Sequence, residues 1–274
     1  MNLTVERSQS RSLDYLALTY PLTERLDLVG IFNRHCALAP QAENDNGVVL
    51  TAMTHARLAP TPVPLLHMPA WAENYAIGEL YNRPASSFND DACGRALDAL
   101  FPVLPQVWVD LLGQVRSEFG LDLGVLHTDV TLIQVEGHYE ETKASEAPVR
   151  EPARPRHGRT PKGFDSQRKQ VALSMSVTPQ GLPAWWLAHD GNVSDPQVYQ
   201  QHLFALRTWL QQLHPIMVGD SKLPTEENRL AFHRAGAFYV GPASLRREDR
   251  QALQQLWRSG AACSQLVWRD QSPQ

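Results

Sequence analysis

Residues 123–137, LGVLHTDVTLIQVEG, are the stretch from which the rest of the chain is interpreted. Apolar and β-branched residues dominate it, which predicts a β-strand covered on both faces. Asp129 stands in the middle, and a carboxylate is costly to bury unless it is paired or binds a metal. A second apolar run, PIMVGD at 215–220, also ends in an aspartate, Asp220. Two strands that each bring an aspartate to one end of a sheet predict a divalent-metal site.

The composition indicates an ordinary globular protein. With 274 residues, 43% hydrophobic and 20% charged, the chain is long enough for two domains and is unlike a disordered segment. No apolar run has the length of a membrane span, so we expect no membrane partner. Three scattered cysteines predict a cytoplasmic protein without a disulfide framework. Because the net charge is −4, nucleic-acid binding would require a local basic patch.

The first part of the chain, residues 1–120, predicts a helical domain. Apolar spacing and capping residues indicate helices over 27–35, 48–58, 92–101 and 103–119. Gly120 follows the last of these and predicts its end. No catalytic set of residues stands out in this part, and a role in DNA binding or assembly is the expectation for it.

Residues 121–274 change to strands. Further strands are predicted over 171–177, 182–189, 215–220 and 237–240, with helices over 195–213, 225–234 and 248–257. The order is three strands, then helix, strand, helix, strand. It predicts an α/β fold with a mixed sheet and flanking helices, similar to the ribonuclease-H-like fold. In that fold the first and fourth strands are neighbours, which would bring Asp129 and Asp220 together.

A long loop is predicted over 138–167, because this segment is rich in proline and charge and poor in apolar residues. From 143 to 169 eight Lys or Arg face three acidic residues, which makes this the one basic patch of the chain. A solvated loop without a partner is the alternative interpretation. The candidate nucleic-acid-binding residues are Arg154, Arg156, Arg159, Lys162, Arg168 and Lys169.

Other polar residues give weaker signals. His127 precedes Asp129 by two positions, so in a regular strand it points to the same side and could support a metal ligand. An ordinary hydrogen-bonded histidine is the alternative. His189 lacks zinc-ligand spacing, and Ser174 and Ser176 lie in no nucleophile turn.

Several short stretches together resemble insertion-sequence transposases of the DDE type, in which an N-terminal helical domain of unknown function precedes a ribonuclease-H-like core. The resemblance covers about residues 26–242. Its motifs are FNDDACGRALD at 88–98, HTDVT at 127–131, HG at 157–158, QVAL at 170–173, GLP at 181–183, GNVSD at 191–195, VGD at 218–220 and EEN at 226–228.

The resemblance implies that Asp129 and Asp220 are catalytic, metal-binding residues for DNA transposition by phosphodiester hydrolysis and strand transfer. It also implies two Mg²⁺ or Mn²⁺ ions, transposon-end DNA as partner, and pairing with a second copy or a full-length transposase. The expected location is the bacterial cytoplasm, at the nucleoid when DNA is bound. The family's third acidic ligand, a glutamate on a later helix, has no counterpart that we identify here.

We therefore expect a truncated transposase-derived protein that is inactive alone. A non-catalytic DNA-binding or transposase-pairing regulator is the alternative. Two further hypotheses are an enzyme completed by another chain or a second reading frame, and an unstable remnant without function.

Overall fold

The computed structural model describes residues 10–37, 45–137, 139, 152–159, 163–209, 214–242 and 247–260. These residues divide into two compact units. Of the described residues, one unit contains those within 10–123, 136–139, 152–155 and 205–209, and the other contains those within 124–135, 156–204 and 214–260. A domain boundary at residue 120 stays a prediction.

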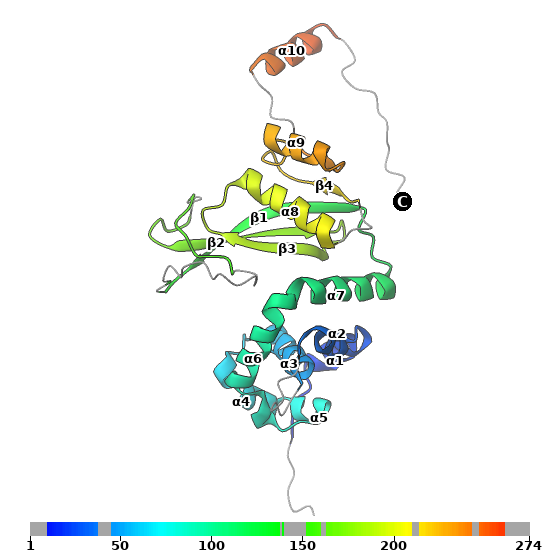
Figure 1. Cartoon of the computed structure of the whole chain (residues 1–274), viewed down its shortest axis with the longest axis vertical. Coiled ribbons are helices and arrows are strands. Elements are labelled where there is room, and N and C mark those ends of the chain that lie inside the picture. The colour runs from blue at the N-terminus through cyan, green and yellow to red at the C-terminus, as the bar shows by residue number, and fades with distance from the viewer. Residues whose placement is uncertain are drawn as a thin grey trace, which may run out of the picture. The chain divides into compact units, whose positions relative to one another are not determined.

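The first unit is helical, as its apolar spacing predicted (Figure 1). Its elements are α1 (Leu16–Arg25), α2 (Leu28–His35), α3 (Asn46–Leu58), η1 (Leu65–His67), α4 (Met68–Asn74), α5 (Ile77–Tyr81), η2 (Ala85–Phe88), α6 (Asp90–Leu100), η3 (Phe101–Val103) and α7 (Leu104–Phe119). Local signals set several ends. The Asn89 side chain accepts from the Ala92 N–H at the start of α6, and Gly120 ends α7 with a φ of 66°.

The core of this unit contains one histidine. His55 is 0% exposed among residues such as Leu16, Ile31 and Phe88. Its Nδ1 lies 2.9 Å from Thr19 Oγ1, and its Nε2 lies 3.0 Å from the Tyr81 hydroxyl. Burial lowers the pKa of His55 to about 4, so the ring is neutral at pH 7.

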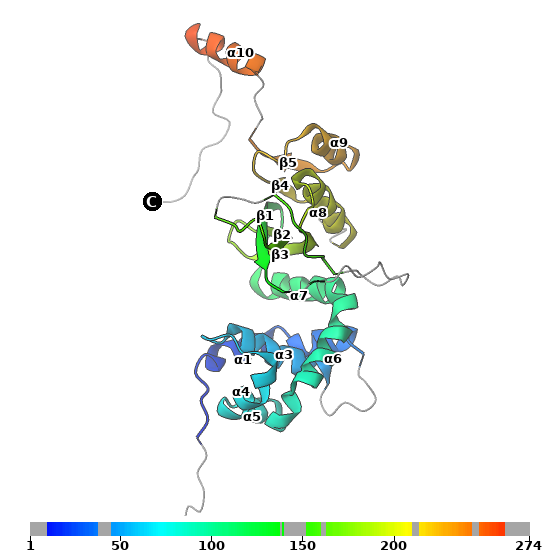
Figure 2. The same ribbon diagram turned by 90° about the vertical axis from the view of Figure 1, so that its left-hand side faces the viewer.

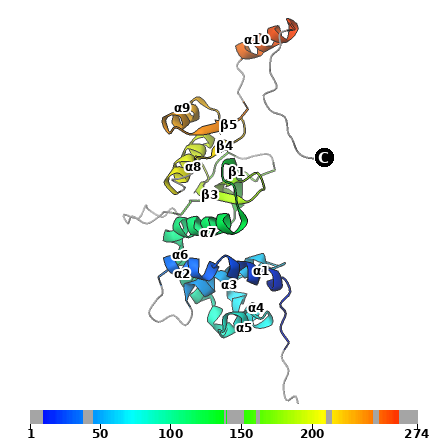
Figure 3. The ribbon, with the colours of Figure 1, turned by 90° about the vertical axis from the view of Figure 1, so that its right-hand side faces the viewer.

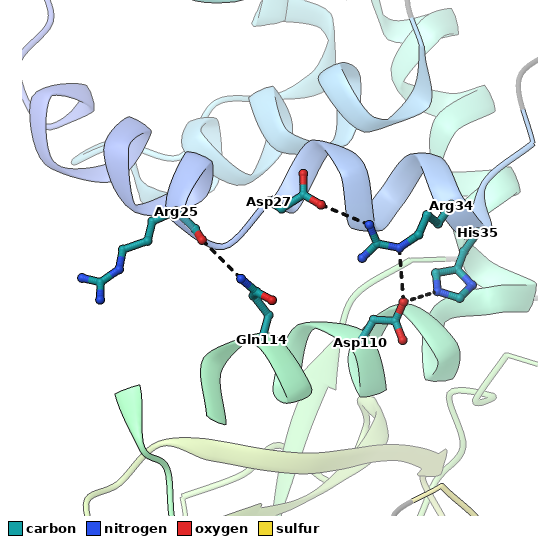
Figure 4. A network of polar contacts seen from close by, with 6 residues as sticks. All are labelled: Arg25, Asp27, Arg34, His35, Asp110 and Gln114. Atoms are coloured by element: carbon teal, nitrogen blue, oxygen red, sulfur yellow. Dashed lines mark hydrogen bonds and ion pairs between the residues drawn. The ribbon is translucent and has the colours of Figure 1, made fainter. Parts of the chain in front are cut away.

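Polar contacts join α2 to α7 (Figure 4). Asp110 of α7 lies 2.9 Å from His35 Nε2 and 3.5 Å from Arg34 Nε, and Arg34 also pairs with Asp27 at 3.0 Å. The Gln114 side chain donates to the Arg25 carbonyl at 3.5 Å. These contacts fix which side of α7 faces α2, although exposed ion pairs add little stability.

The run Asp90–Phe119 meets the length and composition of a membrane span, which differs from our expectation of no such stretch. The run is long because α6 continues through η3 into α7 across Pro102 and Pro105. A single span of this kind is weak evidence, and the contacts of Asp110 with α2 are those of a helix packed in a folded domain.

The second unit is built on a five-stranded mixed sheet in the order β3-β2-β1-β4-β5 (Figures 1 and 2). The strands are β1 (Val125–Val135), β2 (Lys169–Val177), β3 (Pro183–Asp190), β4 (Ile216–Val218) and β5 (Phe238–Val240). β1 pairs antiparallel with β2 and parallel with β4. The predicted α/β class, strand order and pairing of the first and fourth strands are confirmed.

Three helices belong to this part of the chain: α8 (Asp195–Trp209), α9 (Glu226–Arg234) and α10 (Arg247–Arg258). The Thr225 side chain caps α9, as predicted. α9 lies beside β5, where the rings of Phe232 and Tyr239 meet edge to face at 5.1 Å (Figure 3). α8 lies against the sheet through Tyr199 and His202, which are both fully buried.

The prediction that β1 is covered on both faces is wrong. Leu126 and Thr128 are buried, whereas His127, Asp129 and Ile133 are exposed, so burial alternates along the strand. The buried face of β2 is also the unexpected one. Apolar residues alternate along the strand at 171, 173, 175 and 177, but the fully buried side carries the small and polar residues Ala172, Ser174 and Ser176.

The reason is a polar network between the sheet and α8. His202 Nδ1 lies 2.9 Å from Ser174 Oγ, and its Nε2 lies 2.7 Å from Ser176 Oγ. Ser176 also meets Thr128 Oγ1 at 2.6 Å, and Ser174 meets His189 Nε2 at 2.8 Å. Because each buried polar atom finds a partner, serines can occupy positions where an apolar residue was expected.

Candidate functional site

Asp129 lies on the exposed face of β1, opposite Met175 of β2. One carboxylate oxygen, Oδ1, accepts the backbone N–H of Val130 at 2.7 Å. His127 is exposed on the same side of the strand, as its spacing predicted. An open strand face therefore accounts for an aspartate within this apolar run, because the exposed carboxylate needs no metal to offset burial.

Asp220 follows β4 by two residues and is exposed. Its Oδ1 accepts the Tyr199 hydroxyl at 3.0 Å and the Lys222 backbone N–H at 3.0 Å. A Cβ at Gly219 would lie 2.7 Å from Leu223 Cδ2 and 3.3 Å from the Tyr199 ring. The glycine thus lets the turn close against Tyr199, and the two hydrogen bonds fix one edge of the carboxylate.

The sheet brings the two aspartates to one place. In the parallel pair of β1 and β4, His127 is opposite Val218. Asp129 and Asp220 each follow this opposed pair by two residues, with β4 itself ending at Val218. Burial raises the pKa of the Tyr199 phenol, and so do the hydrogen bond and charge of Asp220 and the charge of Asp129. Both carboxylates therefore act on the same hydroxyl group.

These carboxylates fit a divalent cation in part. Carboxylate oxygens are the ligands that Mg²⁺ and Mn²⁺ take, and Mg²⁺ completes its shell with water. Asp220 Oδ1 is already engaged by two donors, which leaves Oδ2 for an ion. Within the described ranges no group of three His, Cys, Asp or Glu side chains could hold a metal. The donor set suits one ion and lacks the further ligand that a pair of ions requires.

Two of the predicted basic residues lie near Val135, the last residue of β1. Lys169 is opposite Val135, and Arg156 pairs with the next residue of β2, Gln170. Arg154, Arg156 and Arg159 belong to the described segment 152–159, which meets the start of β2. Lys169 is the first residue of β2, and Arg168 Nε pairs with Asp165 at 3.4 Å. Lys162 lies outside the described residues, as does most of 138–151.

Ser174 and His189 are hydrogen-bonded, but they are 0% and 6% exposed, so their contact is structural. Sequence reasoning missed Tyr199 as the partner of Asp220, since a tyrosine in a helix carries no signal of such a contact. It also missed Gln170, a buried amide whose only sequence signal is a polar residue beside the apolar run of β2.

A family model described as a domain of unknown function (DUF4277) matches residues 8–106. The match covers α1 to α6, where the resemblance placed a helical domain of unknown function. A search of the curated proteins finds no significant match.

The solved structures that the chain is similar to include complexes of the Mos1 mariner transposase. The Mos1 paired-end complex with the left transposon end shares 11% identity over 82% of this chain and 67% of that one, with a TM-score of 0.28. The Mos1 mariner paired end complex with Mn shares 12% identity over 93% of this chain and 76% of that one, also with a TM-score of 0.28. At such low TM-scores these likenesses carry no argument here.

Proposed function

We propose that this chain is a transposase-related protein of the DDE type, in which Asp129 and Asp220 bind a divalent cation. The observation that supports the proposal is the parallel pairing of β1 and β4, in which His127 is opposite Val218, two residues before Asp129 and Asp220 respectively. The motifs HTDVT and VGD contain these same residues, and the strand order is that expected for a ribonuclease-H-like core.

The residues around the carboxylates have distinct roles in this proposal. Asp129 and Asp220 hold the cation, and Tyr199 and the Lys222 N–H orient Asp220 through its Oδ1. A bound Mg²⁺ or Mn²⁺ would supply Lewis-acid stabilisation for phosphodiester hydrolysis or strand transfer. DNA is the substrate class that the transposase resemblance implies, with transposon ends as the specific partner.

Mn²⁺ binding to the purified protein tests the site, measured by electron paramagnetic resonance of the free ion. We expect Asp129→Asn and Asp220→Asn each to weaken binding at least tenfold, because each removes one of two charged ligands. Asp98→Asn is the matched control, since Asp98 is exposed on α6. Wild-type affinity in both site variants would refute the proposal.

Strand cleavage is a separate question from metal binding. The described residues supply two acidic ligands here, so we expect the chain alone to nick supercoiled plasmid with Mn²⁺ no faster than Asp129→Asn does. Nicking that vanishes in that variant would show that the chain is a complete enzyme, and the expectation of inactivity would be wrong.

A non-catalytic DNA-binding role is the second candidate function. The observation that favours it is that two of the predicted basic residues, Arg156 and Arg159, are attached beside β2. Binding that persists in EDTA and in Asp129→Asn would support it, and its structural basis is argued below.

A further inference from the structure

Within the segment 152–159, residues 156–159 are attached to the sheet at a defined position. Arg156 and Gln170 exchange both backbone hydrogen bonds, each with an N–O distance of 2.9 Å. The partner of Val171 on β3 is Asp190, the last residue of that strand. Arg156 thus pairs with β2 one residue beyond the point where β3 ends, and the segment extends the sheet there.

The Gln170 side chain strengthens this attachment. It is 2% exposed, and its Nε2 donates to the Arg159 carbonyl at 3.1 Å and to the Gly191 carbonyl at 2.9 Å. One buried amide group therefore ties the segment to the residue that follows β3. A buried amide with both N–H groups satisfied favours a single arrangement, because any other would leave polar groups unpaired.

Two glycines allow the backbones to approach this closely. A Cβ at Gly158 would lie 2.1 Å from the Gly191 carbonyl oxygen. A Cβ at Gly191 would lie 1.8 Å from the Gln170 backbone carbonyl oxygen. No other residue fits either position without moving the backbone. We call Gln170, Gly158 and Gly191 the clamp.

The clamp holds a short, strongly basic segment. Residues 152–159, PARPRHGR, contain three arginines, one histidine and no acidic residue. Pro152 and Pro155 restrict its backbone further. Fixing these charges before binding lowers the entropy that a ligand must offset.

We propose that residues 152–159 form a preorganised phosphate-binding arm for duplex DNA and that Gln170 is its positioning residue. The choice of DNA rests on the proposed function. Arg156 is opposite Gln170, and Gln170 is opposite Gln134 of β1, five residues beyond Asp129. At about 3.3 Å per residue the arm lies about 17 Å from Asp129 along the strand, which is about five base pairs of duplex.

Binding of the full chain to a fluorescent 30-base-pair duplex, measured by anisotropy in EDTA across a salt series, tests the arm. The combined variant Arg154→Ala, Arg156→Ala, Arg159→Ala should bind at least tenfold more weakly at low salt. The slope of log K against log salt should fall by about 2.7, because each phosphate contact contributes about 0.9.

The control variant combines Arg57→Ala, Arg95→Ala and Arg229→Ala, which removes the same charge from exposed arginines elsewhere. Equal weakening in both triple variants would mean that only net charge matters and would overturn the arm. Single-stranded DNA or RNA competing as well as duplex would overturn the choice of duplex DNA.

Gln170→Leu tests the positioning role, since it removes the amide and keeps all three arginines. We expect weaker binding with an unchanged salt slope, together with faster trypsin cleavage after the arm arginines while circular dichroism is unchanged. If Gln170→Leu does not fold, Gly158→Ala replaces it, with Gly113→Ala as the matched glycine control because its Cβ would meet nothing within 4 Å. Wild-type binding and cleavage in both clamp variants would overturn the clamp.

The two proposals fail separately. Asp129→Asn in EDTA leaves the arm intact, so loss of DNA binding only in the arginine variant, with Mn²⁺ binding retained, assigns DNA binding to the arm. Normal DNA binding with absent Mn²⁺ binding would refute the metal site and leave the arm standing.

Discussion

At the scale of single residues, the contacts of His202 are the strongest constraint in the sheet unit. His202→Leu would keep the volume near α8 but remove one of the two hydrogen-bond partners of each hydroxyl, those of Ser174 and Ser176. Losing a buried hydrogen bond typically costs about 0.5–1.5 kcal/mol, so with two lost we expect the free energy of unfolding to fall by about 1–3 kcal/mol. Urea unfolding followed by circular dichroism measures this loss.

The control variant removes hydroxyl groups at the same site that would otherwise lose a hydrogen-bond partner. Adding Thr128→Val and Ser176→Ala to His202→Leu removes both members of the Thr128–Ser176 hydrogen bond together, and should recover part of the lost stability. If His202→Leu alone costs less than about 0.5 kcal/mol, as an exposed substitution does, the network contributes nothing to stability.

The sequence predicted the positions of Asp129 and Asp220 better than their surroundings. Each aspartate ends or interrupts an apolar run, and that is a local pattern. Exposure of Asp129 could not be predicted from it, because β1 carries apolar residues on its open face as well, including Ile133 at 46% exposure. The catalytic and nucleic-acid roles assigned to these residues stay predictions.

At the scale of elements, α7 and the glycine that ends it allow a matched test. Gly120 has a φ of 66°, and no atom lies within 4 Å of where its Cβ would be. Gly120→Ala should therefore lower the free energy of unfolding by about 1 kcal/mol through backbone strain alone. Thermal unfolding monitored at 222 nm is the measurement.

Gly113 is the counterpart inside α7, again with nothing within 4 Å of its Cβ but with ordinary helical backbone. Gly113→Ala should raise stability by about 0.5–1 kcal/mol, since alanine loses less entropy in a helix. If Gly120→Ala and Gly113→Ala both raise or both lower the free energy of unfolding, the assignment of Gly120 as the helix stop is contradicted.

Helix ends were predictable because caps act over three or four residues. The stop at Gly120 follows the prediction, and the caps at Asn89 and Thr225 are residue types that favour a helix start. The buried face of β2 was not predictable, because the partner of Ser176 is His202, 26 residues later in the chain. No local alternation can indicate that a distant histidine will satisfy a serine hydroxyl.

At the scale of the whole molecule, each compact unit contains a buried neutral histidine. Burial lowers the pKa of His55 to about 4 and that of His202 to about 3, from about 6.5 in the unfolded chain. Below pH 6.5 the unfolded state binds more protons, so stability is full above that pH and is lost as pH falls toward pH 4 and then pH 3.

We expect the free energy of unfolding to fall on the order of 3 kcal/mol per histidine over this pH range. Urea unfolding at pH 7, 5.5 and 4.5 measures it, and Tyr75→Phe, which touches neither ring nitrogen, serves as the control background. In His202→Leu the slope of stability against pH should become shallower. A slope that is unchanged in this variant would show that His202 does not titrate as described.

The order of the five strands was predictable, because short connections and an alternating helix–strand pattern admit few sheet topologies. The attachment of residues 152–159 was not. It depends on Gln170 and Gly191 meeting a segment that the sequence presents as loop, and only the folded sheet brings these three together.

The polar network has a consequence for how this protein can change by mutation. Gln201 Oε1 can only accept, so the His189 Nδ1 must carry its proton, and Ser174 must then donate to His189 Nε2. The same logic passes through both nitrogens of neutral His202 to Ser176 and Thr128. The donor and acceptor of every hydrogen bond in this network are therefore fixed once the first donor is known.

A substitution that reverses one donor forces all the others to reverse or break. The six positions should consequently show strong epistasis, with single variants harmful and matched combinations tolerated. The six positions lie on β1, β2, β3 and α8, and we expect them to be conserved or substituted together. They are Thr128, Ser174, Ser176, His189, Gln201 and His202.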